Sequence, residues 1–445
     1  MKFVGLLLSC ALGAFAAGET IYIHGADVYP VSAPMMKNVS VLIENGKITD
    51  VGPKVVAPKG ARTIEGKGLR VYPGLIDSNT ELGLSEISAE RVTVDTGELG
   101  EFMPQLRAVV AVNPDSEHFG VVRVNGITSA MTFPNAGGGG GGRGGASNQI
   151  IAGQAALVHT DGWTWEEMEV RRSAAMSVIF PNLGNRGGRG FGGGNPDLAL
   201  PEIFGQTSVG GFTQQKRNYE QQIAKLAEFF EDARKYQKAR AANTPGFVRD
   251  LKFEAMLPVL EGKLPLAVTA RNATPIRDAV AFAEKQNVKI VILQPREITK
   301  VASLLKEQKV PVILGRTLAL PDEEDDPYDE AFTIPAETYK SGVKFAFGTF
   351  TNEFVRNMPY QAAVSVAFGL PYDEALKAVT LNAAEIWGVA DKIGSIDKGK
   401  IADLMITDGD PFDVRTQIRN LFINGKEITL SNKQIRLYEK YMSRQ

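Results

Sequence analysis

Short apolar runs separated by turn residues stand near both ends of the chain. Thr20–His24 has the composition of a β-strand, and residues 39–48 place two apolar runs on either side of an Asn-Gly pair. An Asn-Gly pair between such runs is a strong signal for a β-hairpin. Residues 402–407 and 420–426 repeat the short runs and the same turn. The pattern predicts that the two ends pair into one β-domain.

The spacing of apolar residues changes in the middle of the chain, where strand-like runs alternate with helical spacing. Leu264–Ala270 is one such run, and Ile276, Ala279 and Ala283 follow at the spacing of a helix. Further strand-like runs are Lys289–Leu293, Val310–Leu314 and Val343–Phe347, and helical runs are Asn218–Ala242, Ile298–Leu305 and those starting near Asn357 and Asp373. Repeated strand and helix units predict a parallel sheet, and so long a stretch suits a (β/α)₈ barrel.

These patterns divide the chain into four parts. We predict a signal peptide over residues 1–16, the first part of a small β-sandwich domain over residues 17–72, a TIM-like (β/α)₈ barrel over residues 73–394, and the rest of the β-sandwich domain with a tail over residues 395–445.

The first residues have the features of a secretory leader. A positively charged start precedes the apolar stretch Phe3–Phe15, and a small-x-small cleavage signal ends at Ala16. The stretch is shorter than the ~20 residues that a membrane span requires. We expect a protein without a membrane span that is periplasmic or secreted after cleavage near Ala16. The alternative is a lipoprotein anchored through Cys10.

The composition is that of an ordinary globular protein and argues against several kinds of site. Hydrophobic residues make up 44% and charged residues 22%, with a formal net charge of -2. A chain with this net charge has no excess of positive charge to attract nucleic acid, so we expect no nucleic-acid partner. The single cysteine lies in the predicted leader, so we expect a mature chain without disulfides, thiolate zinc sites or cysteine nucleophiles.

Three biased segments interrupt the pattern. Residues 137–145 and 184–194 are rich in glycine, and residues 322–326 are acidic. We interpret all three as loops. The alternatives are a phosphate cradle or an Arg-Gly tail for RNA, and a calcium loop. The glycine-rich segments lack the Gly-Lys-Ser/Thr of a P-loop, and the acidic run lacks alternating calcium ligands.

Three motifs resemble those of a known family. They are VYPGLID at Val71–Asp77, TLNAAE at Thr380–Glu385 and GSIDKGKIADL at Gly394–Leu404. In these segments the chain resembles the amidohydrolase superfamily, in which the first motif marks entry into the first barrel strand and the last marks the return into the β-domain. The segments Gly262–Val268 and Asn357–Ala363 look most like imidazolonepropionase-like members, with prolidase-like relatives nearby.

The resemblance implies a metal site whose usual ligands are replaced. In the family, a His-x-His pair ends the first barrel strand, and two further histidines and an aspartate end later strands. Matched by motif and local context, these positions carry Asn79, Glu81, Thr269, Gln294 and Phe350. Amide, hydroxyl and phenyl groups are poor zinc ligands. The resemblance therefore implies a degenerate site, and we expect no bound cofactor.

The family's hydrolytic chemistry depends on those ligands. The metal lowers the pKa of a bound water and polarises the scissile carbonyl, while a carboxylate moves the proton. Without them the mechanism has no nucleophile, although Glu81 and Asn79 could hold a hard cation weakly. His24, His118 and His159 have no second histidine at ligand spacing, and no Gly-x-Ser-x-Gly elbow is present.

Other polar residues are predicted at the mouth of the barrel. Arg271, Arg316, Asn352 and Glu353 follow strand-like runs, so we expect them at or just beyond the carboxyl ends of the strands. Arginine and amide groups can recognise a carboxylate or an amide. These four are therefore candidate ligand-binding residues.

Three functions remain open. The leading hypothesis is a non-catalytic or catalytically altered family member that binds a small molecule or peptide. Such a protein could also form a homo-oligomer, or a hetero-oligomer with an active amidohydrolase. The alternative is a working hydrolase of C–N bonds in cyclic amides or peptides, using a reduced zinc site or metal-free chemistry around Glu81 and Glu353. A purely structural module is the third hypothesis, and it predicts no buried polar pocket.

Overall fold

A computed structural model describes residues 19–134, 149–182, 209–243, 245–321 and 326–444. The predicted signal peptide with Cys10 and both glycine-rich segments lie outside the described residues, as does the acidic run apart from Asp326.

Strands from both ends of the chain share one sheet. Its members are β1 (Ile21–Val28), β2 (Met36–Glu44), β3 (Lys47–Gly52), β4 (Arg62–Glu65), β5 (Arg70–Pro73), β14 (Leu404–Thr407), β15 (Ile418–Ile423) and β16 (Lys426–Ile428). The strand order is β16-β15-β14-β5-β1-β2-β3, and β4 pairs with β1. Asn45-Gly46 and Asn424-Gly425 form the two predicted hairpin turns, with positive φ at all four residues as a type I′ turn requires.

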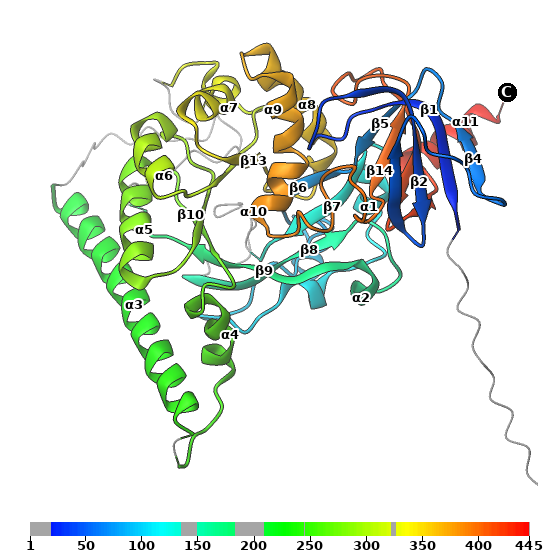
Figure 1. Cartoon of the computed structure of the whole chain (residues 1–445). Helices are drawn as coiled ribbons and strands as arrows, with labels where there is room; N and C mark the ends of the chain where they lie inside the picture. Colours follow the sequence, from blue (N-terminus) through cyan, green and yellow to red (C-terminus); the bar gives the residue numbers. More distant parts are fainter. Residues whose placement is uncertain (1–18, 135–148, 183–208, 244, 322–325, 445) are drawn as a thin grey trace, which may run out of the picture.

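The middle of the chain forms the predicted barrel (Figure 1). Its eight strands are β6 (Leu75–Thr80), β7 (Ile127–Thr132), β8 (Ile151–His159), β9 (Glu169–Ile179), β10 (Leu266–Thr269), β11 (Ile290–Leu293), β12 (Val312–Leu314) and β13 (Phe345–Phe347). They follow one another in chain order, and β13 lies against β6, so the barrel is nearly closed.

One strand corrects the prediction of a fully parallel sheet. β8 is antiparallel to both β7 and β9, whereas the other neighbouring strands are parallel. Only residues 160–168, with the single turn α2 (Trp165–Met168), connect β8 to β9. A parallel connection needs a crossover of about a dozen residues or more, so this short connection forces an antiparallel pair.

The helices occur between and after the barrel strands. They are α1 (Glu117–Arg123), α3 (Val209–Ala241), α4 (Leu251–Leu260), α5 (Ala273–Gln286), α6 (Ala302–Glu307), α7 (Glu330–Ser341), α8 (Met358–Ala367), α9 (Tyr372–Ala378) and α10 (Leu381–Ile386), and α11 (Lys433–Met442) follows the last strand. α3 begins earlier than predicted, and the predicted helix at Ile298–Leu305 divides into a 3₁₀ turn at Ile298–Lys300 and α6.

Within the described parts of the chain, no helix combines the length and the apolar character needed to cross a bilayer.

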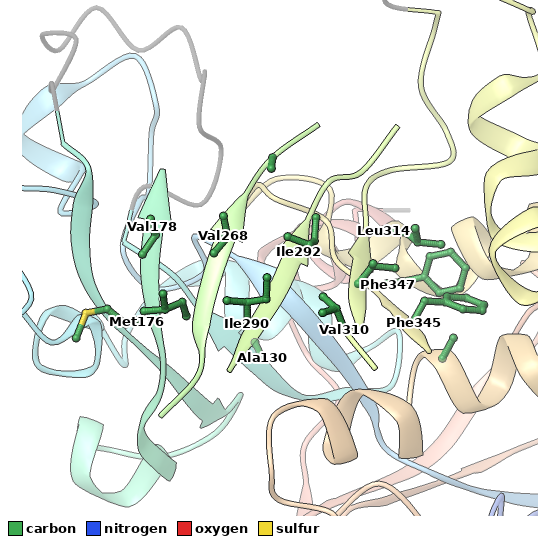
Figure 2. Close-up of a cluster of buried hydrophobic side chains, with 14 of the residues drawn as sticks. Ala130, Met176, Val178, Val268, Ile290, Ile292, Val310, Leu314, Phe345 and Phe347 are labelled. Carbon is green, nitrogen blue, oxygen red and sulfur yellow. The ribbon is translucent and has the colours of Figure 1, made fainter. Parts of the chain in front are cut away.

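The barrel strands bury side chains on both faces. Val268, Ile292 and Phe345 belong to the core under the helices, part of which is shown in Figure 2. The alternate residues Ala267 and Ala346 belong to a second cluster inside the barrel. This two-residue alternation explains why the strands read as continuous apolar runs in the sequence.

Candidate functional site

The five positions matched to the family's metal site lie at the carboxyl ends of barrel strands. Asn79 is near the end of β6 and Glu81 follows it, while Thr269 is the last residue of β10. Gln294 follows β11 directly, and Phe350 comes three residues after β13. In a barrel of parallel strands this edge carries the functional residues.

Phe350 fills its position with an apolar ring. Its backbone has φ of 56°, its side chain is buried, and it belongs to the cluster inside the barrel together with Ile76 and Ile313. A Cβ added at Gly348 would lie 3.0 Å from Phe350 Cε2 and 3.0 Å from Asn79 Cβ, so these two side chains flank the same backbone. The position matched by resemblance to the family's aspartate is therefore apolar and next to Asn79.

Asn79 is fully buried, and neither its amide nitrogen nor its amide oxygen has a hydrogen-bond partner in the described part of the chain. Leaving a buried polar group unpaired costs about 1–3 kcal/mol. An amide in this state favours a bound water or a polar group of a ligand at this position.

Two of the predicted arginines line a cavity with Gln294. The cavity has a volume of about 150 Å³ and lies among the segments after β10, β11 and β12 and the start of α7, with Arg271, Gln294 and Arg316 in its wall. Arg296 also lines it and pairs with Glu330 at 2.9 Å. A volume of this order holds a ligand about the size of benzene.

Asn79, Glu81, Thr269 and Phe350 are absent from the wall of that cavity. The structure thus groups Gln294 with the two arginines and places Asn79 beside Phe350. The convergence of all the former ligand positions on one cavity stays a prediction.

The other two candidate ligand-binding residues contact the loop after β6. The Asn352 amide is buried and donates to the carbonyl of Ser85. Glu353 is exposed and accepts a hydrogen bond from Ser88 Oγ at 3.3 Å. These contacts hold the segment after β13 against the segment after β6.

Asp77 is a buried polar residue that the sequence analysis did not single out. Its Oδ1 accepts hydrogen bonds from the backbone N–H groups of Asn79 and Thr349, both at 3.1 Å, and its Oδ2 accepts one from Thr349 Oγ1. Burial raises the pKa of Asp77 to about 7, against the lowering effect of these hydrogen bonds. The sequence could have indicated Asp77, because it is an ionisable residue at the end of the otherwise apolar VYPGLID motif, and such a residue needs a partner when it is buried.

The histidines lie away from the former metal positions. His24 Nδ1 lies 3.2 Å from the Tyr22 hydroxyl, and His118 Nε2 lies 3.0 Å from the carbonyl of Glu86. His159 ends β8, and its Nε2 lies 2.9 Å from Asp403 Oδ2 in a fully buried pair. Burial alone lowers the pKa of His159, but the Asp403 carboxylate outweighs that effect and raises it above the ordinary value. This pair joins the barrel to the terminal sheet.

The residues at the five positions matched by resemblance do not fit a zinc pair. They offer one carboxylate, two amides, one hydroxyl and a phenyl ring, where zinc prefers imidazole and carboxylate. Among the residues described, no three His, Cys, Asp or Glu side chains gather as a metal site would require.

A larger hollow lies at the opposite end of the barrel. It has a volume of about 750 Å³, and Lys263, Lys289 and Lys309, which precede strands β10, β11 and β12, contribute to its wall. The amino-terminal end of a barrel of this kind supports stability rather than function. We therefore place the candidate site at the carboxyl ends.

Known proteins share both the sequence signature and the fold. The profile of the amidohydrolase family matches residues 220–429. Amidohydrolase tasK from Hapsidospora irregularis is 25% identical over 405 residues, a match that covers 86% of this chain and 39% of that protein. The chain thus spans well under half the length of this relative.

Solved structures of amidohydrolases and prolidases have the same fold as this chain. An amidohydrolase from Thermotoga maritima has a TM-score of 0.76 and 25% identity, over 92% of this chain and 99% of that one. A prolidase solved with N-methylphosphonate-L-proline has a TM-score of 0.51 and 16% identity, over 92% and 99% of the two chains, and shows the fold alone. The three motifs, the barrel and these relatives together support a place for this chain in the amidohydrolase superfamily.

Proposed function

We propose that this chain is an exported amidohydrolase-family protein that has lost or altered the family's catalysis and binds a small-molecule or peptide ligand. The observation that carries the proposal is the buried ring of Phe350 beside the unpaired amide of Asn79. A phenyl ring neither takes a proton from water nor ligates a cation. A buried amide can still hydrogen-bond a ligand, because it offers one acceptor and two donors.

Metal content and turnover together test this proposal. The full chain is purified after growth with added zinc, beside a zinc-dependent amidohydrolase prepared in the same way. We expect far less than one zinc per chain and no turnover of cyclic amides or Xaa-Pro dipeptides. Stoichiometric divalent metal, or turnover that rises with added metal, would overturn it.

Asp77 favours the alternative of a working hydrolase. A carboxyl group whose pKa lies near 7 can exchange a proton under neutral conditions. Both of its oxygens accept hydrogen bonds from Thr349 and the Asn79 backbone, and Asp77 lines neither of the two cavities described above. Turnover that survives chelation and is abolished in a folded Asp77→Asn variant would establish this alternative.

The branch of the family and any partner remain proposals as well. We propose that the chain is closest in kind to the imidazolonepropionase-like and prolidase-like members, from Gly262–Val268 and Asn357–Ala363. Association with an active relative would explain why a barrel without the usual ligands is retained. Size measurement of the chain alone and mixed with such a relative tests the association.

A further inference from the structure

The last helix, α11, separates apolar and charged residues onto different faces. At about 100° per residue, one face carries all of its apolar side chains. They are Ile435, Leu437, Tyr438, Tyr441 and Met442. The rest of the helix surface carries Glu439 and the cations of the helix and its end. Lys433, Lys440 and Arg444 border the apolar face beside Leu437, and Arg436 lies farther from it.

The apolar face is exposed. Leu437 is 39%, Tyr438 66%, Tyr441 56% and Met442 48% exposed, and the helix has no buried residue. Single exposed apolar residues are common on protein surfaces, but four within one ten-residue helix form a patch.

α11 contacts the rest of the chain through its charged side. Arg436 pairs with Glu117 of α1 at 3.2 Å, and Asn432, which caps the helix by accepting from Ile435 N at 2.9 Å, lies against Gly120 of α1. A surface helix normally turns its apolar stripe to the core and its charges to water. In α11 the apolar stripe faces water, although the charged side chains are exposed too, so this stripe lacks the cover that it would normally have within the described chain.

The charge of the helix together with the two residues after it differs in sign from that of the whole chain. Four cations, Lys433, Arg436, Lys440 and Arg444, and one anion, Glu439, give 4 − 1 = +3, whereas the chain carries a formal net charge of -2. A basic face beside an apolar face with tyrosines is the composition of helices that lie in a lipid interface. Tyrosine suits that boundary because its ring is apolar and its hydroxyl stays in water.

We propose that α11 lies on the surface of an anionic phospholipid membrane. Its apolar side chains enter the boundary between headgroups and acyl chains, and Lys433, Lys440 and Arg444 at the edge of the face bind lipid phosphates. The helix lies parallel to the surface and does not cross it. Figure 1 shows α11 on the opposite side of the molecule from helices α3 to α6, so those helices would not obstruct the approach.

A second copy of the chain fits this face less well. A ten-residue helix is about 15 Å long and about 10 Å wide, so one face covers roughly 150 Å². A stable dimer buries about 800 Å² per partner. Pairing two copies through α11 would also bring two cationic edges together. An anionic lipid surface complements the charge, and each apolar side chain that enters it adds to binding together with that attraction.

Vesicle sedimentation with the full chain tests the proposal. The probes are vesicles of phosphatidylcholine alone and vesicles with about one third phosphatidylglycerol. We expect binding to the anionic vesicles, little binding to the neutral ones, and release by high salt. The double variant Tyr438→Ser/Tyr441→Ser should lose most of the binding to anionic vesicles. The double variant Lys433→Gln/Lys440→Gln should weaken that binding about tenfold or more at low salt.

Matched controls lie elsewhere on the surface. Trp163→Ser removes an aromatic side chain that is 89% exposed, and Lys252→Gln/Lys285→Gln removes two exposed lysines of α4 and α5. Both should bind vesicles like the parent chain. Thermal unfolding confirms that every variant is folded. Failure of the parent chain to bind anionic vesicles, or equal loss in the control variants, would overturn the proposal. So would a concentration-dependent dimer that the tyrosine variant abolishes while vesicle binding is absent.

Discussion

Phe350 has a backbone conformation that aromatic residues seldom adopt. Its φ of 56° lies in the left-handed region, which costs a non-glycine residue about 1–3 kcal/mol. The backbone is held there because Phe350 N donates to the carbonyl of Asn79 at 2.7 Å. A backbone hydrogen bond thus holds the turn, and the side chain that the turn presents is apolar.

Restoring the family's ligands should restore metal binding if only the ligands were lost. The variant combines Asn79→His, Glu81→His, Thr269→His, Gln294→His and Phe350→Asp. We expect about one zinc per chain, because at least three of the four introduced imidazoles and the carboxylate would surround one point, which is enough for a catalytic-type site. Metal analysis after gel filtration measures it, with Thr269→His and Gln294→His alone as controls that each add one imidazole.

Stability must be measured beside metal content. Replacing the buried Phe350 ring costs about 3 kcal/mol or more through the cavity it leaves. A folded variant with all five substitutions that binds no more zinc than its single-histidine controls would contradict the idea that only the ligands were lost. The orienting partners of the imidazoles would then be the next groups to restore.

Strands β6 and β13 close the barrel through a small set of polar contacts. Thr349 binds Asp77 through its N–H and its hydroxyl, Phe350 N binds the Asn79 carbonyl, and Thr80 Oγ1 donates to the Thr351 carbonyl at 2.6 Å. β13 is only three residues long, so the segment after it supplies contacts that the strand itself lacks.

Thr349→Val tests the contribution of the hydroxyl to this closure. Valine keeps the shape but leaves Asp77 Oδ2 without that donor, so we expect a loss of about 1–3 kcal/mol in the free energy of unfolding. The loss should be larger above pH 7, where the Asp77 carboxyl is charged, than at pH 5, since its pKa is about 7. Chemical denaturation at both pH values measures it. Thr349→Ser, which keeps the hydroxyl, should behave like the parent chain, and equal losses in both variants would argue against this role.

The molecule is held together by contacts between segments far apart in the chain. β14 lies between β5 and β15, so the terminal sheet forms only when both ends meet. Asp403, the residue directly before β14, joins its own segment to three others. Its carbonyl accepts from Gly74 N at 2.9 Å, and its Oδ1 accepts from Asn424 N at 2.7 Å. Its Oδ2 contacts His159 at the end of β8.

His159→Asn should destabilise the whole chain in a pH-dependent way. Removing one partner of a buried ion pair costs about 3–5 kcal/mol. The folded pKa of His159 is raised, so the pair's contribution is fully present below the ordinary pKa of about 6.5 and declines as the pH rises through the folded pKa. Denaturation at pH 6 and pH 9 should therefore show a larger difference from the parent chain at pH 6. His118→Asn is the control, and a difference that grows with pH would contradict the assignment.

Part of the candidate site could be predicted from the sequence. The VYPGLID motif located Asn79 and Glu81, and short apolar runs placed Thr269 and Gln294 at strand ends, because strand length and alternation are local properties. The grouping of Gln294 with Arg271 and Arg316 was not predictable, since a cavity depends on how loops from three strands pack on α7.

The local sequence pattern was sufficient to predict the hairpins, most of the barrel strands and the barrel fold. The residues of a turn and the spacing of apolar residues reflect interactions between neighbours in the chain. It was insufficient for the direction of β8, the burial of His159 against a residue 244 positions away, and the outward face of α11. Those features depend on which surfaces meet after the chain has folded, and pairings so distant in sequence leave no mark in the local spacing of residues.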